Sequence, residues 1–85
     1  MTSLLDILTE EKELIEELKE VRDKQVQRLY KIDDARMFPK HFKNVDVKRE
    51  KEEVERLKKR EEQLEADIKD VRNSLARYLL KLYER

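Results

Sequence analysis

Pro39 is the only proline in an 85-residue chain that contains no glycine, so it marks the one place where a long helix must break. Its ring has no amide donor and pushes the preceding residue, Phe38, toward extended geometry. The chain is otherwise dominated by Glu, Lys, Leu and Arg, a composition typical of long helices and coiled coils. The sequence therefore predicts two helices separated by a break near residue 39.

The segment before Pro39 carries apolar residues mostly three or four positions apart, which places them on one face of a helix. Thr2 or Ser3 can cap its N-terminus. We expect this first helix to span about residues 3–37. The apolar residues assigned to its buried face are Leu4, Leu5, Ile7, Leu8, Leu14, Ile15, Leu18, Val21, Val26, Leu29, Tyr30 and Ile32.

The segment after Pro39 has a regular heptad pattern. Asn44 or Asp46 can cap it, so we expect a connector over about residues 38–45 and a second helix over about 46–85. Its two core positions are filled by Val47, Val54, Glu61, Ile68, Leu75 and Leu82, and by Glu50, Leu57, Leu64, Val71 and Tyr78. Glu61, like Glu11 and Arg22 of the first segment, is a polar residue in an apolar seam, where it can fix the register or form a pair.

Two long helices joined by a short connector most simply fold back on each other. We therefore predict an all-α fold, an antiparallel two-helix coiled-coil hairpin that forms a single domain over residues 1–85. Such a thin hairpin buries few apolar side chains for the backbone that it orders, so we expect it to dimerise into a four-helix bundle. Folding near residue 40 places Val54 near Val26, Leu64 near Ile15, and Val71 near Leu8.

The open end of this hairpin, where both termini lie, is rich in apolar residues. The sequence SLARYLLKLYER spreads apolar side chains over an arc of about 200° at 100° per residue, more than one partner helix covers. We therefore predict a self-association surface at the open end. It comprises Leu4, Leu5, Leu8, Leu75, Tyr78, Leu79, Leu82 and Tyr83.

The closed end contains MFPKHF, which holds the only proline, the only histidine and both phenylalanines. In one interpretation Met37, Phe38 and Phe42 form a plug that covers the end of the hairpin. In the other, one of the rings is displayed for recognition by a protein groove or by nucleic-acid bases. The residues predicted to bind a partner at this tip are Arg36, Met37, Phe38, Lys40, His41, Phe42 and Lys43.

Few residues are suited to catalysis or metal binding. Without cysteine there is no thiol nucleophile or thiolate metal site, and without glycine there is no phosphate-binding loop of the usual kind. The nearest plausible carboxylates to His41 are Asp33 and Asp34, and we expect His41 to be an exposed loop residue. The sequence thus predicts a protein that is not an enzyme and needs no cofactor or metal.

No stretch approaches the roughly 18 to 20 apolar residues of a membrane span, and the first residues lack the apolar run of a signal peptide. We therefore expect a soluble, cytoplasmic protein that does not bind membranes.

The predicted function is that of a coiled-coil interaction module, such as a small adaptor, assembly or regulatory protein. It would self-associate and bind a protein partner of unknown identity through its tip or its open end. The alternative is a nucleic-acid-binding helical dimer, because the basic segment 40–51 precedes a heptad run in the order that basic-zipper proteins use. Asp46 and Glu50 interrupt that segment, and the net charge of the chain is zero.

Overall fold

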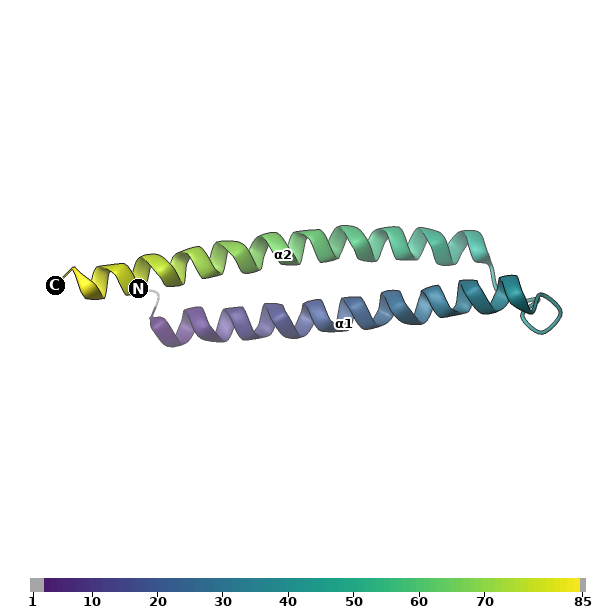
Figure 1. Ribbon diagram of the computed structural model, residues 1–85, viewed down its shortest axis with the longest axis horizontal. Coiled ribbons are helices and arrows are strands. Elements are labelled where there is room, and N and C mark those ends of the chain that lie inside the picture. The colour runs from purple at the N-terminus through teal and green to yellow at the C-terminus, as the bar shows by residue number, and fades with distance from the viewer. Residues whose placement is uncertain (1–2, 85) are drawn as a thin grey trace.

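The computed structural model describes residues 3–84, which form two long helices and the connector between them (Figure 1). Helix α1 spans Leu4–Met37 and helix α2 spans Val47–Tyr83. They run antiparallel and side by side, and the rod that they form measures 68 × 18 × 16 Å. The predicted all-α helical hairpin is confirmed. Residues 1, 2 and 85, which the predicted domain includes, lie outside the described residues.

Both helices begin at residues whose side chains accept a backbone amide. The Ser3 hydroxyl accepts from the amide of Asp6 at 3.1 Å, and the Asp6 carboxylate accepts from the amide of Ser3 at 3.3 Å. This reciprocal arrangement is a capping box. At the start of α2, the Asp46 carboxylate accepts from the amide of Arg49 at 3.1 Å. Local sequence therefore determines where each helix starts.

Helix α1 ends at the break that Pro39 predicts. Phe38 leaves the helical region, with φ −130° and ψ 63°, although its amide still donates to the Asp34 carbonyl at 2.8 Å. The Phe38 carbonyl then accepts from the amides of His41 at 3.0 Å and Phe42 at 3.2 Å, which turns the chain back toward α2. The connector therefore has its own hydrogen bonds.

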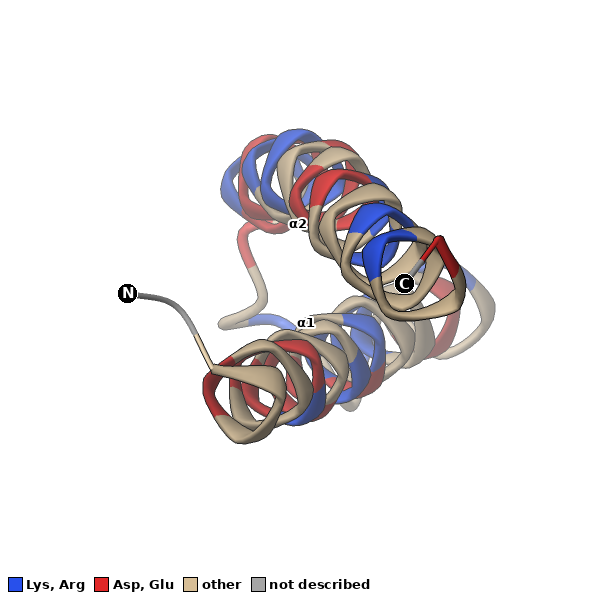
Figure 2. Ribbon diagram, turned by 90° about the vertical axis from the view of Figure 1, so that its left-hand side faces the viewer, with Lys and Arg blue, Asp and Glu red and all other residues tan. Residues whose placement is uncertain are grey.

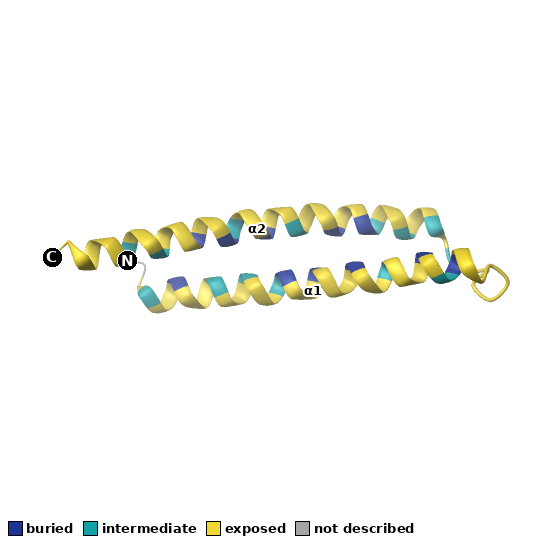
Figure 3. Cartoon of the chain, viewed as in Figure 1, coloured by how far each residue is buried: buried dark blue, intermediate teal, exposed yellow. Residues whose placement is uncertain are grey.

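The buried face of α2 follows the predicted heptad (Figure 3). Its buried residues are Val54, Leu57, Leu64, Ile68 and Val71. Leu64 is 0% exposed and packs in one cluster with Leu18 and Val21 of α1. Each fully buried aliphatic side chain of this kind stabilises the fold by about 1.5–3 kcal/mol relative to an exposed one.

The buried face of α1 differs from the predicted one. Leu8, Ile15 and Val26, expected to pack against α2, are 43%, 41% and 48% exposed. The predicted face was too wide, because a helix in a two-stranded coiled coil buries only the narrow stripe of its a and d positions. The α1 residues at these positions, from the first turn to the last, are Leu4, Ile7, Glu11, Leu14, Leu18, Val21, Gln25, Arg28, Ile32 and Ala35.

The a and d positions of the two helices form the seam of the hairpin. This seam accommodates polar residues whose side chains have hydrogen-bond partners. Gln25 is only 9% exposed, and its Nε2 donates to Glu61 Oε2 at 3.3 Å. Within residues 3–84, no buried side-chain nitrogen or oxygen lacks a hydrogen-bond partner. The seam is therefore compatible with polar residues that the apolar spacing of the sequence does not predict.

Candidate interaction surfaces

The hairpin has a groove along each side of its seam. In an antiparallel coiled coil the e positions of both helices flank one side of the seam and the g positions flank the other. We name the first the apolar-lipped groove; its e residues are Leu8, Ile15, Arg22 and Leu29 of α1 and Lys58, Glu65, Arg72 and Leu79 of α2. We name the second the polar groove; its g residues are Glu10, Glu17, Lys24 and Lys31 of α1 and Glu53, Arg60, Asp67 and Ser74 of α2.

Ion pairs cross both grooves. In the apolar-lipped groove, Arg22 Nε donates to Glu61 Oε2 at 3.1 Å and Arg22 Nη2 donates to Glu65 Oε1 at 3.0 Å. In the polar groove, Arg60 Nε donates to Glu17 Oε1 at 3.1 Å. Seen from the open end, both helices carry acidic and basic residues around their outer faces (Figure 2). Charge thus helps to hold the two helices in register on both sides.

The polar residues that the sequence analysis placed in the seam are all paired, although Arg22 lies at an e position beside the seam and not in it. Arg22 and Glu61 bind each other, and the hydrogen bond to Glu61 raises the pKa of the Arg22 guanidinium above its usual value. Glu11 accepts from Arg72 Nε at 3.2 Å. Arg22 therefore links α1 to two carboxylates of α2.

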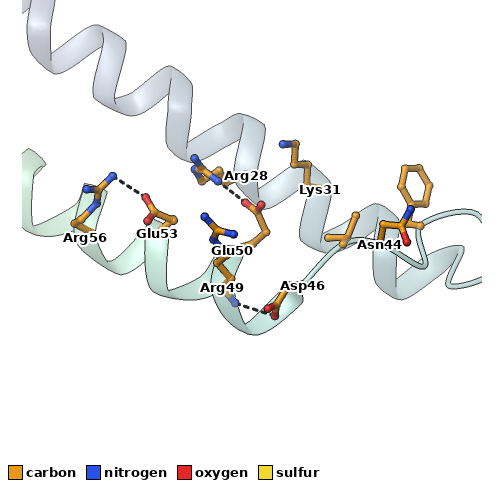
Figure 4. A pocket seen from close by; sticks show the side chains of 10 residues that line it. Arg28, Lys31, Asn44, Asp46, Arg49, Glu50, Glu53 and Arg56 are labelled. Carbon is orange, nitrogen blue, oxygen red and sulfur yellow. Dashed lines mark hydrogen bonds and ion pairs between the residues drawn. The ribbon is translucent and has the colours of Figure 1, made fainter.

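A hollow of about 560 Å³ lies beside the closed end (Figure 4). It is lined by Arg28, Lys31, Phe42, Asn44, Val45, Asp46, Arg49, Glu50, Glu53 and Arg56. Arg28 Nη1 donates to Glu50 Oε2 at 2.8 Å, and this bond raises the pKa of Arg28. Glu53 pairs with Arg56 at 2.7 Å, and Asp46 caps α2. Every carboxylate that lines the hollow is thus engaged within the chain, and the Arg28–Glu50 pair, which joins the two helices, favours a structural role in fixing the register.

The tip residues predicted to bind a partner are all exposed. Met37 is 63% exposed, Phe38 51% and Phe42 37%, so neither ring is a fully buried plug. Phe42 lines the hollow beside Val45, whereas Phe38 is the more exposed of the two rings. The polar members of the predicted set, Arg36, Lys40, His41 and Lys43, are exposed as well.

The residues predicted at the open end range from half-buried to largely exposed on both helices. Leu4, Leu75 and Tyr78 are half-buried, whereas Leu5, Leu79, Leu82 and Tyr83 are 72%, 41%, 50% and 87% exposed. Leu8, predicted as part of this surface, also lies on the lip of the apolar-lipped groove. Leu80, which the prediction left out, is 60% exposed. The structure thus brings the predicted open-end residues to one end of the rod, with α2 reaching past the start of α1 (Figure 1).

The structure also reveals exposed apolar residues that the sequence interpretation had assigned to the buried face. Ile15, Val26 and Leu29 are 41–49% exposed and Tyr30 is 67% exposed. The signal that identifies them is the strict heptad that begins at Leu4, because all four fall outside its a and d positions. Sequence reasoning missed this heptad because three of its seam positions hold the polar residues Glu11, Gln25 and Arg28, whereas the four exposed apolar residues lie outside the seam.

The basic segment 40–51 presents its cations to solvent. Lys40, Lys43, Lys48, Arg49 and Lys51 are all exposed. Asp46 and Glu50 are engaged by the α2 cap and by Arg28, so both acidic residues that interrupt the segment have partners inside the chain.

His41 is exposed, and its amide donates to the Phe38 carbonyl. Across residues 3–84, no group of three or more His, Cys, Asp or Glu side chains has the geometry to hold a metal ion. In the same part of the chain, neither helix has the length and apolar character needed to cross a membrane.

Comparisons of the chain with protein-family models, with curated proteins and with solved structures found no match.

Proposed function

We propose that the protein is a non-enzymatic coiled-coil interaction module that self-associates through its open end. The observation that carries the proposal is the overhang of α2. Extending the register of the Arg22–Glu61 pair toward the open end places Leu4 level with Leu79, so residues 80–83 reach beyond α1, and α2 extends past the start of α1 (Figure 1). Because the capping box starts α1 at Leu4, α1 does not cover this part of α2.

The overhang continues the apolar seam without a partner helix. Leu82 occupies the a position that follows Leu75, yet it is 50% exposed. Leu79 and Tyr83 are exposed beside it, at 41% and 87%. Apolar side chains at successive core positions gain stability when a second helix covers them. A second copy brings the same overhang, so two hairpins can bury this surface against each other in a symmetric contact.

We also propose that the protein binds a protein partner through its tip. The rod is 68 Å long, so association at the open end leaves the tip accessible at the opposite end. Phe38 is half-exposed there among cations, and exposed aromatic residues are common anchors in protein interfaces. One molecule would then associate at one end and recognise a partner at the other.

Sedimentation equilibrium of Leu82→Glu and Leu80→Glu variants tests the self-association. We expect the parent protein to have a mass above one chain at tens of micromolar. Leu82→Glu places a charge in the seam and should weaken association at least tenfold. Leu80→Glu is the matched control, because Leu80 lies on the same overhang but faces away from the seam, and it should associate like the parent. A parent protein that sediments as one chain, or a Leu82→Glu variant that associates as strongly as the parent, contradicts the proposal.

A further inference from the structure

The lips of the two grooves differ in composition. Among the e residues that border the apolar-lipped groove, Leu8, Ile15, Leu29 and Leu79 are apolar. Val26 lies beside them at a b position. None of the g residues that border the polar groove within the described chain is apolar. Only one side of the seam therefore offers an apolar surface to a further helix.

The apolar-lipped groove is hollowed at the seam. A depression of about 480 Å³ lies between the helices, lined by Ile15, Leu18, Arg22, Glu65, Ile68, Lys69, Arg72 and Asn73. Farther toward the closed end, a second depression of about 390 Å³ lies on α1 alone, beside the seam, and is lined by Val26, Leu29, Tyr30 and Asp33. The apolar side chains on the α1 lip remain 41–49% exposed, so they have surface left to bury.

The grooves also differ in charge. The e positions and the adjacent b positions of the two helices carry nine basic and four acidic residues, whereas the g and c positions carry seven basic and nine acidic residues. Lys12, Lys19 and Lys69, all on the apolar-lipped side, form no ion pair with any residue between 3 and 84. The apolar-lipped groove therefore combines unburied apolar surface with excess positive charge.

A second copy of the chain does not complement this groove. Its apolar lip carries the same excess of cations, so two such lips would repel each other. Its acidic surface, which includes Glu10, Glu13, Glu17 and Glu20 of α1, offers no apolar side chains from its g and c positions. The chain thus presents its apolar groups and its acidic groups on different faces. A molecule that complements the groove must carry both kinds of group on the same face.

We infer that the apolar-lipped groove binds an amphipathic helix of a different protein, one whose apolar stripe is flanked by acidic residues, as the third helix of a coiled coil. Leu8 and Leu29 are 21 residues apart, so the lip is about 32 Å long and takes a helix of about six turns. Lys12 and Lys19 lie between its apolar ends and would face acidic residues in the middle of the partner helix. This interface shares Leu8 with the open-end surface, but from Lys12 to Leu29 it lies along α1 away from the α2 overhang, so it does not depend on self-association there.

The probe for this inference is a designed fluorescent peptide of 22 residues. Leucines stand where the peptide would meet Leu8, Ile15, Val26 and Leu29, and glutamates flank them. Fluorescence anisotropy should show saturable binding to the full chain. A peptide with lysine in place of every glutamate should bind at least tenfold more weakly, because it would meet the cations of the groove.

Matched variants locate the binding. Lys12→Glu with Lys19→Glu should weaken binding of the acidic peptide at least tenfold. Lys24→Glu with Lys31→Glu changes the net charge equally but on the polar groove, and it should change affinity less than twofold. Ile15→Ser should weaken binding at least fivefold. Circular dichroism should show unchanged helix content in each variant, since all five side chains are exposed.

Four outcomes overturn the inference. The first is a parent protein that does not bind the acidic peptide. The second is an equal loss of affinity in both charge-reversed pairs, which would indicate general electrostatic attraction. The third is a single-stranded DNA oligonucleotide that binds through Lys12 and Lys19 when the peptide does not, which would identify a nucleic-acid surface. The fourth is loss of self-association in Ile15→Ser, which would show that a second copy occupies the groove.

Discussion

The two sides of the hairpin seam are built from the same two helices, yet they present different surfaces. Each side is bridged by an arginine–glutamate pair, Arg22–Glu65 on one and Arg60–Glu17 on the other. Apart from this ion pair, the polar groove is bordered only by charged and polar residues. The apolar-lipped groove is also bordered by half-exposed aliphatic side chains. Ion pairs can therefore maintain the register on both sides, while the apolar residues on one side remain available for a further contact.

This difference separates apolar residues that hold the hairpin together from apolar residues that do not. Seam residues such as Leu64 are covered by the opposite helix, whereas lip residues such as Ile15 bury only part of their surface. Since the hydrophobic free energy scales with the apolar area removed from water, lip residues contribute less to folding. Their remaining surface is what a third helix would bury.

The largest predicted effect compares a seam residue with a lip residue. Leu64→Ala should lower the free energy of unfolding by about 3 kcal/mol or more, because it leaves a cavity in the centre of the core. Ile15→Ala should lower it by only about 1 kcal/mol, because the side chain is 41% exposed. Chemical denaturation at one fixed protein concentration measures both values. Equal losses would place Ile15 in the seam opposite Leu64, as the sequence interpretation first had it, and would remove the distinction between seam and lip.

A smaller effect is expected for the bridge across the polar groove. A double-mutant cycle of Glu17→Gln and Arg60→Gln should give a coupling free energy below about 1 kcal/mol, because both side chains are nearly half exposed and solvent screens their attraction. The measurement is again denaturation, at low salt and then at high salt, where the coupling should shrink further. A coupling of several kcal/mol that salt does not change would mean that the polar groove is shielded from water, and the contrast between the grooves would need revision.

The sequence predicted the fold and the second helix well because each rested on a strong local rule. Pro39 leaves no choice about where the first helix ends, and Ser3 and Asp46 are favourable caps. The heptad of α2 is interrupted only by Glu50 and Glu61, so its buried face could be read directly. Backbone chemistry and a regular pattern were enough in these regions.

The buried face of α1 could not be predicted in the same way. Its apolar residues fill both the seam and the lip, and choosing between them requires knowing that Glu11, Gln25 and Arg28 are satisfied by partners on α2. Those partners are 61, 36 and 22 positions away in the chain, respectively, so no local pattern reveals them. The candidate surfaces at the tip and the open end followed from composition, whereas the apolar-lipped groove became apparent only after the packing had shown which heptad register α1 uses.

The most direct test of the difference between the grooves is to observe where an acidic helix lands. The chain contains no cysteine, so Val26→Cys and Lys24→Cys variants can each carry a single nitroxide label. These positions are two residues apart on α1 but border different grooves. On addition of the acidic peptide, electron paramagnetic resonance should show a loss of label mobility at position 26 and none at position 24. Equal immobilisation at both positions, or immobilisation at position 24 alone, would contradict the claim that the apolar-lipped groove is the binding surface.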